Sequence, residues 1–499
     1  MIFRPYRALL LPLLILCLLL TACQQNTLPA TPTAQVTPGS GTPRVDGAAT
    51  RTPTRQLTPT AKPTPTTREA LGADPGALQG KEIDFWHPWQ GELAQRAQRS
   101  ADEFNRVNEW GVHVRVRAFD STGAMLEALA AAQERAAEEA ASGTGAAAVP
   151  DLIVAPSELL SGWMQESGSR ENGRLLVDLN DYIHESRVGL SEEEINDYLP
   201  AFWAQDEAAG LRFGLPALRE ARVLFYNQGW AADLGFNAPP ATPADFKKQA
   251  CAAAQKNNTS GNLALYGTGG LLVDSDALTM LSWLSAFGAQ PLPEKDNGAY
   301  QFESEESEAA LEYLRDLVED GCAWIARSGG AQEHFARRKA IFYTGTLSEM
   351  AVQKGWQDQL ASGDDWTILP FPAEEGDPLV YSSGYSYSVL KTTPEEQLSA
   401  WLFARWMSAP PNAARLGEAL PSIPVTGAVA TLMKEKANTF PWNQILPLRD
   451  ALRPVPGFAS WRQARRPLED AAWQVYHLPA DGLPEILPQL DETVREVLR

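Results

Sequence analysis

Two strand-like runs joined by a polar crossover, at residues 213–227, constrain the fold more than any other part of the chain. The first run ends at a proline, the crossover carries Arg219 and Glu220, and Val223–Tyr226 then has the branched and aromatic bias of a second strand. Asn227 ends that strand before a short helical turn. Taken alone, the pattern fits an ordinary βαβ connection, so the rest of the chain has to decide what the crossover does.

Downstream of the crossover, helix and strand patterns alternate, which is typical of α/β proteins. Thr242 is the expected N-cap of a helix over Asp245–Gln255, with Pro243 at the first helical position, where a missing N–H costs nothing. A strand is predicted over Leu263–Tyr266 and a further helix over Ala277–Phe287. The predicted fold class is therefore α/β.

Residues 1–22 have the composition of an export signal. Arg4 and Arg7 supply positive charge, and Ala8–Leu20 form an apolar core of about 13 residues, which is too short for a membrane span. The core ends in Leu-Thr-Ala-Cys, which resembles a bacterial lipobox, so Cys23 is the expected lipid-modified, palmitate-bearing N-terminus. The alternative is a simple signal peptide cleaved nearby, which would leave Cys23 as a stray thiol.

Residues 23–80 are dominated by Thr, Pro, Ala and Gly. Because large apolar side chains are almost missing, the segment cannot offset the entropy of ordering a core, and a disordered linker is expected. The remaining residues, 81–499, exceed the usual size of one domain, which predicts two lobes. With 44% hydrophobic residues, including 15 Trp, 12 Tyr and 17 Phe, the chain can build sizeable cores.

The formal net charge of −20 bears on the partners of the chain. Nucleic acid and anionic membrane surfaces carry the same sign of charge, so neither is an expected partner. Contact with the membrane is expected only through the lipid anchor.

Two cysteines fall in the predicted globular part, Cys251 and Cys322. Two thiols in an exported protein commonly pair, so we expect a disulfide between them, with two separate buried thiols as the alternative. The other two, Cys17 and Cys23, belong to the N-terminal segment. The spacing of His and Cys does not support a zinc site, so no metal and no cofactor are predicted.

The first strand of the globular part, at Ile83 and Phe85, leads into a loop rich in aromatic and polar side chains. Ligands of open α/β sheets bind where the carboxyl end of a strand meets the next helix, so this loop is a candidate binding segment. For Trp86 core packing is the alternative, whereas Trp89, beyond a proline and beside polar residues, is expected to be exposed. The candidates in this loop are Trp86, His87, Trp89, Gln90 and Glu92.

The order of these segments resembles family 1 of the extracellular solute-binding proteins of bacterial ABC importers, the maltose-binding-protein-like sugar-binding lipoproteins. The shared features are the proline-ended strand, the polar crossover, the Tyr-Asn strand end, the Pro-Pro-Ala-Thr helix start, and a strand led by Pro-Asp at residues 150–154. The resemblance implies a two-lobed, periplasmic-binding-protein-like class II α/β fold with a three-segment hinge. In that fold the crossover is the first hinge strand.

The resemblance also implies how the chain divides into lobes. The predicted division is a signal peptide at 1–22, a linker at 23–80, lobe 1 at 81–217 and 367–408, and lobe 2 at 218–366 and 409–499.

Further ligand-binding positions are implied by the same resemblance. Ser157 and Glu158 occupy a strand-to-helix loop that binds sugar hydroxyls in related proteins, with helix capping by Ser157 as the alternative. Trp283 is a candidate cleft aromatic, with core packing as the alternative. The other predicted ligand-binding residues are Glu220, Tyr381, Ser383, Tyr385 and Trp461.

The predicted function is capture of a sugar or oligosaccharide and its delivery to the permease subunits of an ABC importer, by a monomer anchored on the extracytoplasmic face of the membrane. Aromatic faces would pack on the C–H surface of the sugar while carboxylates bind its hydroxyls, and no catalysis is expected. One alternative is a glycerol-3-phosphate-type protein of the same family, with Arg219 or Arg222 supplying positive charge. The other is a cleft-type glycoside hydrolase, for which Glu92, Glu158 and Glu220 are eligible acids.

Overall fold

The computed structural model describes residues 67–142, 149–165, 175–295, 298–374 and 377–499. The predicted signal peptide, the predicted anchor Cys23 and the predicted linker up to residue 66 lie outside the described residues. Among the residues described, no helix combines the length and the apolar composition that a membrane span needs.

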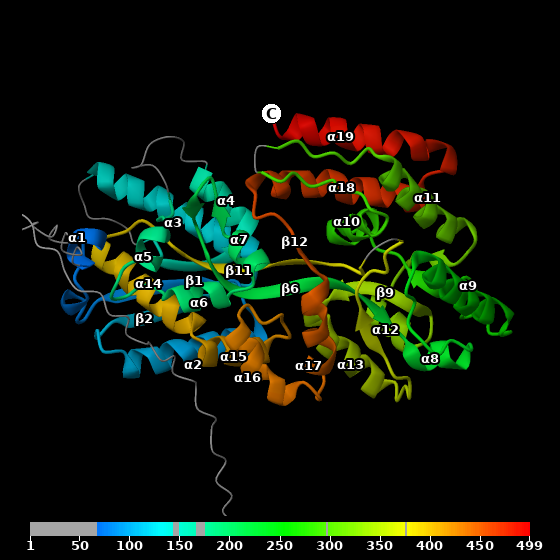
Figure 1. Cartoon of the computed structure of the whole chain (residues 1–499), viewed down its shortest axis with the longest axis horizontal. Helices are drawn as coiled ribbons and strands as arrows, with labels where there is room; N and C mark the ends of the chain where they lie inside the picture. The colour runs from blue at the N-terminus through cyan, green and yellow to red at the C-terminus, as the bar shows by residue number, and fades with distance from the viewer. Residues whose placement is uncertain (1–66, 143–148, 166–174, 296–297, 375–376) are drawn as a thin grey trace, which may run out of the picture. The chain divides into compact units, whose positions relative to one another are not determined.

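One mixed sheet of ten strands lies at the centre of the described residues (Figure 1). Its order is β2-β1-β3-β11-β6-β9-β7-β8, while β10 pairs with β6 and β12 with β11. The short strands β4 and β5 form a separate hairpin. The bounds are β1 Glu82–His87, β2 His113–Ala118, β3 Leu152–Pro156, β4 Glu207–Ala208, β5 Leu211–Arg212, β6 Leu215–Tyr226, β7 Gly269–Leu272, β8 Ala323–Trp324, β9 Ala340–Thr346, β10 Thr367–Leu369, β11 Val380–Val389 and β12 Leu452–Pro454.

Strand β6 is the long strand that links the two ends of the sheet. Residues 215–221 pair antiparallel with β11, and residues 222–226 pair antiparallel with β9. The two runs and the crossover predicted from the sequence therefore form one continuous strand, with polar Arg219 and Glu220 at its middle.

The directions of the strands bring two sets of strand ends toward each other. Strands β3 and β6 both run antiparallel to β11, so β3 is parallel to β6, and β1 and β2 run with β3. Strand β9 runs antiparallel to β6, and β7 and β8 run with β9. The carboxyl ends of β1–β3 and those of β7–β9 therefore face each other across the middle of β6. Ligands of α/β sheets bind at such ends.

Helices flank the sheet, and local sequence explains where several of them begin. Thr242 caps α9 as predicted, because its hydroxyl accepts the N–H of Asp245 at 3.1 Å, and Pro243 stands in the first turn. Thr393 and Glu396 form a capping box at the start of α14. The bounds are α1 Thr67–Leu71, α2 Gly91–Val107, α3 Thr122–Ser142, α4 Ser157–Gln165, α5 Asn180–Ile183, α6 Glu192–Asp197, α7 Pro200–Ala204, α8 Gln228–Asp233, α9 Pro243–Thr259, α10 Ala277–Ala286, α11 Glu305–Glu319, α12 Ala331–Ala336, α13 Met350–Gln359, α14 Pro394–Ser408, α15 Pro410–Ala419, α16 Gly427–Met433, α17 Trp442–Ile445, α18 Ala459–His477 and α19 Ile486–Val497.

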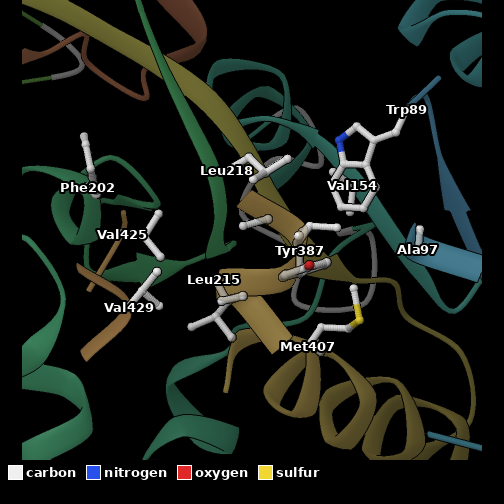
Figure 2. Packing of buried hydrophobic residues seen from close by; sticks show 14 of the residues in the cluster. Trp89, Ala97, Val154, Phe202, Leu215, Leu218, Tyr387, Met407, Val425 and Val429 are labelled. Carbon is white, nitrogen blue, oxygen red and sulfur yellow. The ribbon is translucent and has the colours of Figure 1, made fainter. Parts of the chain in front are cut away.

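Two large clusters of buried hydrophobic side chains pack between the sheet and the helices. The first gathers around β1, β3, β11 and α14 and continues along β6 to Phe225. Figure 2 shows part of it, with the ring of Trp89 beside Val154 and Tyr387. The second packs α9, α10, α18 and α19 together, and in it the ring of Phe246 stacks on Phe342 of β9 at 4.1 Å between centroids.

A disulfide joins Cys251 in α9 to Cys322, which follows α11, and this confirms the predicted pairing. The bridge ties together two points 71 residues apart in the chain. It therefore closes a long loop within the part of the fold built on β7 and β8.

The predicted strand over Leu263–Tyr266 is wrong. These residues form turns, with Leu263 90% and Tyr266 71% exposed, and the strand in this region is β7. In β7, Gly270 lies so close to the Cys322 carbonyl that a Cβ would overlap it, so the site requires glycine. Glycine is depleted in strands, so the apolar run before it was the stronger sequence signal.

The packed part of the chain begins before the predicted boundary at residue 81. Helix α1 starts at Thr67, and Leu71, Ala73 and Leu78 are all buried in the first cluster. The predicted linker is therefore too long at its C-terminal end. Its isolated apolar residues, separated by Gly and Pro, gave no periodic signal from which packing could be predicted.

Helices α15 and α16 follow the predicted lobe boundary at 408. The guanidinium of Arg415 in α15 pairs with Glu103 of α2 at 3.1 Å, and Ile423 forms an isolated bridge with Arg219. Both helices are thus attached to the part of the fold that contains α2 and the first half of β6. The lobe boundaries themselves stay a prediction.

Candidate functional site

The candidate site lies where the two sets of strand ends face each other. Tyr385 of β11 stands opposite Pro156 at the end of β3, and Ser383 stands opposite Glu220 of β6. Directly opposed residues of an antiparallel pair project to the same side, and residues two apart in a strand share a face. Glu220, Ser383 and Tyr385 therefore lie on one face of the sheet, and each is partly exposed.

A second carboxylate, that of Glu158, lies close enough to Tyr385 to affect the pKa of its phenol. Burial raises the pKa of the Tyr385 phenol, a hydrogen bond with Thr122 lowers it, and the negative charges of Glu220 and Glu158 raise it. Glu158 is in the first turn of α4, directly after β3. Thus residues from the ends of β2 and β3 and from the middle of β6 and β11 converge on Tyr385.

Both carboxylates are in surroundings that oppose ionisation. Burial raises the pKa of Glu158, and the positive charges of Arg465, Arg219 and Arg462 lower it in part. Arg462 and Arg465 are exposed residues of α18, so this helix also contributes charge to the site. For Glu220, burial again raises the pKa, while hydrogen bonds from Ser348 lower it.

The facing side of the site is built from residues that follow β9 and β7. The backbone N–H of Ser348, which comes just after β9, donates to Glu220 Oε1 at 3.2 Å. Arg222, two residues beyond Glu220 in β6, donates to Asp274 Oδ2 at 2.6 Å and to the Thr279 hydroxyl at 3.0 Å. Arg222 thus has a carboxylate partner already.

A buried polar network lies behind these residues. Arg219 is fully buried, with Nη2 on Asp206 at 3.0 Å and Nε on Gln205 at 2.9 Å. The hydroxyls of Ser157 and Ser386 each donate to Asp206 Oδ1 at 2.6 Å. Ser157, one of the predicted ligand residues, is therefore engaged in the framework that joins β3, β6 and β11.

The aromatic residues of the first loop pack into cores. The expected exposure of Trp89 is wrong, because its side chain is only 3% exposed. Phe85, His87 and Trp89 all project into the first cluster, where Trp89 meets Tyr387 edge-on at 6.3 Å (Figure 2). Trp86 projects to the other side, where it packs on Phe119 at 4.9 Å.

His87 is fully buried beside Trp89. Its Nδ1 accepts the backbone N–H of Trp89 at 3.2 Å, and burial lowers the pKa of His87 to about 4. The imidazole is therefore neutral over the usual range of pH and stiffens the turn that follows β1.

The other predicted ligand residues are not gathered at Tyr385. Gln90 is exposed and donates to the Phe119 carbonyl, and Glu92 is exposed and pairs with Arg99 at 2.5 Å. Three lie in the second cluster or beside it: Trp283 and Trp461 are buried there, and the Tyr381 hydroxyl meets Ser285 at 2.9 Å. The structure thus brings together Glu158, Glu220, Ser383 and Tyr385. That these four bind a ligand stays a prediction.

Sequence reasoning missed several residues of this region: Thr122, Asp274, Ser348, Arg462 and Arg465. The available signal for Asp274 is its place directly after a strand, which a strand predicted over Leu263–Tyr266 does not give. Within the described residues, no group of three or more His, Cys, Asp or Glu side chains has a geometry that could hold a metal ion.

The fold is shared with solved carbohydrate-binding proteins. The chain is similar to the GacH receptor of Streptomyces glaucescens GLA.O, with 18% identity, a TM-score of 0.64, and coverage of 84% of this chain and 98% of the receptor. Similar values hold for the sugar-binding protein MalE of Xanthomonas citri, with 18% identity, a TM-score of 0.67, and 83% and 98% coverage. The cyclic α-maltosyl-1,6-maltose binding protein of Arthrobacter globiformis gives 19% identity, a TM-score of 0.66, and 84% and 98% coverage. The likeness confirms the predicted fold class.

A comparison with curated protein sequences gives no match. The family model described as a bacterial extracellular solute-binding protein, however, matches residues 100–441, which is more than half of the chain. The chain therefore belongs to the bacterial extracellular solute-binding proteins.

Proposed function

We propose that this protein captures a carbohydrate between two lobes and delivers it to an ABC importer. The observation that supports this most directly is the convergence of Glu158, Glu220, Ser383 and Tyr385 between strand ends that face each other. The similar proteins from Streptomyces, Xanthomonas and Arthrobacter bind acarbose, sugar and a cyclic maltosyl-maltose, respectively.

The proposed site has the chemistry that a sugar requires. A phenol ring offers an apolar face for C–H groups, and carboxylates and a serine hydroxyl offer partners for the sugar hydroxyls. Glu158 and Glu220 sit where water is partly excluded, so hydrogen bonds to them gain strength from the low local dielectric. A neutral, polyhydroxylated ligand fits better than an ion.

For the glycerol-3-phosphate alternative, Arg219 and Arg222 were the predicted source of positive charge. Arg219 is fully buried against Asp206, and Arg222 pairs with Asp274 and lies 3.8 Å from Asp276. Both guanidinium groups are thus neutralised by carboxylates, which argues against their use for a phosphate. Carbohydrate remains the proposed ligand class.

We propose a division into lobes that differs from the predicted one in its last part. Lobe 1 would contain β1–β3, α2–α7, α14, and also α15 and α16, which are attached to α2 and Arg219. Lobe 2 would contain β7–β10, α8–α13 and α17–α19. The long strands β6 and β11 and the strand β12 would form the hinge, and a ligand that touches both lobes would shift the population toward the closed form.

Export and lipid anchoring through Cys23 are part of the proposal. The family is extracellular, and the sequence before residue 24 has the charge, the apolar core and the final cysteine of a lipoprotein signal. We propose that the protein is a monomer without catalytic activity. Radiolabelled palmitate should enter the wild-type chain in a bacterial host but not the Cys23→Ser variant, and incorporation in both would refute the anchor site.

A thermal-shift and calorimetric screen against mono- and oligosaccharides tests the function. A ligand at about 100 times its dissociation constant should stabilise the chain by about 2.7 kcal/mol. Glu220→Gln and Tyr385→Phe should each weaken that binding, while Glu92→Gln, in an exposed ion pair outside the site, serves as the matched control. Glycerol phosphates belong in the same screen, and the appearance of shortened oligosaccharides would favour the hydrolase alternative.

A further inference from the structure

A hollow lies among α6, α14 and the turn that connects α2 to β2. It is a cavity of about 260 Å³ lined by three aromatic side chains, Trp110, Tyr198 and Trp406, together with leucines and a proline. In Figure 1 these helices lie on the side of the fold that carries α2 and β2. Trp110 precedes β2 and so lies at the amino end of that strand, whereas the site around Tyr385 lies at the carboxyl ends. The two sites share no residue.

The aromatic rings of this hollow are held in place from behind. Phe104 of α2 contacts Trp110 at 6.3 Å and Trp406 at 5.6 Å between ring centroids, and Phe403 stacks on Trp406 at 6.3 Å. Phe104 and Phe403 are fully buried, while Trp110 and Trp406 are partly exposed. The two indoles therefore present fixed, accessible edges and faces, so that little side-chain entropy would be lost on contact with a ligand.

A charged pair at the rim supplies one donor and one acceptor that lie close together without a hydrogen bond between them. Arg405 Nη2 lies 3.8 Å from Glu194 Oε1, which is too long for a hydrogen bond. Nη1 of the same guanidinium donates to the Val188 carbonyl at 3.1 Å, and the other Glu194 oxygen accepts the Ser191 N–H at 2.7 Å. Both side chains are thus fixed through one atom, and the facing Nη2 and Oε1 are close enough for one group beside them to reach both.

A hydroxyl placed beside the pair can contact both atoms, because it accepts from Arg405 and donates to Glu194 at once. A carboxylate or an ammonium group would meet a like charge on one side. A volume of about 260 Å³ is just below the range of drug-sized ligand sites and suits a single ring. An aromatic surface beside a hydroxyl-bridging pair is the same chemistry that recognises the two faces of a pyranose.

From this geometry we infer a second carbohydrate site on the outer face of the lobe that carries β1–β3. It takes one pyranose unit between Trp110 and Trp406, and one hydroxyl of the sugar contacts both Arg405 and Glu194. The site goes beyond the proposed transport function, because it does not lie between the lobes and needs no closure. A single ring with about two hydrogen bonds should bind with a dissociation constant on the order of 1 mM.

The test follows the indole N–H signals of ¹⁵N-tryptophan-labelled protein in NMR spectra. Trp110→Phe and Trp406→Phe variants assign the two signals among the 15 tryptophans of the chain. Glucose, galactose, mannose and N-acetylglucosamine are each titrated to tens of millimolar. The signals of Trp110 and Trp406 should shift with at least one sugar, and Arg405→Gln should weaken that sugar about five- to tenfold.

Two controls separate this site from other effects. Glu220→Gln disables the proposed site at Tyr385 and should leave the shifts at Trp110 and Trp406 intact, so failure of the transport proposal would not affect the result. Trp473→Ala removes a 48% exposed indole that stacks on His477, and this variant should also leave the shifts at Trp110 and Trp406 unchanged. Absence of shifts with all four sugars, loss of the shifts in Glu220→Gln, or unchanged affinity in Arg405→Gln would each overturn the inference.

Discussion

Replacement of Arg219 by methionine tests the role of the polar network in the middle of β6. The guanidinium of Arg219 donates to Asp206, Gln205, Ser386 and the Tyr385 carbonyl, and both members of the ion pair are 0% exposed. Methionine fills much of the same volume but leaves the Asp206 carboxylate with only hydroxyl partners. Removal of one partner from a buried pair costs about 3–5 kcal/mol.

Calorimetric unfolding and chemical denaturation of the variant give the measurement. At about 2.1 cal/mol/K of unfolding entropy per residue, a body of roughly 430 residues loses about 3–6 °C in melting temperature for that cost. Arg99→Met is the matched control, because Arg99 pairs with Glu92 at the surface and should cost less than about 1 kcal/mol.

A double variant decides what the loss means. In Arg219→Met with Asp206→Asn the stranded charge is removed, so much of the loss should be recovered. A single variant as stable as the wild type would refute the reasoning. So would a double variant whose loss equals the sum of the two single losses, because the two groups would then be uncoupled.

Three further predictions concern other parts of the fold. The double variant Cys251→Ser, Cys322→Ser opens a loop of 71 residues and should lower the free energy of unfolding by about 4 kcal/mol. Reduction of the wild type should have the same effect, and equal melting curves with and without reductant would contradict this prediction. His87 has a pKa of about 4 in the folded protein, below its unfolded value, so its contribution to stability is present above about pH 6.5. Roughly 3 kcal/mol of stability is lost as the pH falls toward 4. The wild type should therefore lose more stability than His87→Gln over this pH range, and parallel pH profiles of the two proteins would rule the effect out. A Cβ at Gly457 would overlap the Gln205 carbonyl oxygen, so Gly457→Ala should push apart the segments that carry Gly457 and Gln205 and change ligand affinity. Identical calorimetric titrations for variant and wild type would show that this contact does not affect closure of the lobes.

The sequence predicted well where local chemistry decides the structure. The cap at Thr242 and the polar crossover between two strand-like runs follow from residue types at short range. The disulfide follows from the presence of two cysteines in the predicted globular part, and all three features are present. The order of the motifs predicted the fold class for the same reason, because each strand end and helix start carries its own signal. These features need no knowledge of what packs against them.

The side on which a side chain ends up depends instead on register and long-range packing. Trp89 follows a proline and precedes polar residues, which favoured exposure, yet it continues the alternation of Phe85 and His87 and enters the core against Tyr387, a residue about 300 positions later. At the candidate site, some residues have no local sequence signal at all. Glu220 and Tyr385 could be named from their motifs, but Thr122 and Ser348 carry no signal of their own. The pairing of β6 with β9 brings Ser348 to Glu220, and the pairing of β11 with β3, which continues to β1 and β2, brings Thr122 to Tyr385. Aromatic residues that local sequence suggests as ligand contacts therefore tend to be core residues in such a fold. Polar residues directly after strands, even those outside any recognisable motif, are the better candidates for contact with a ligand.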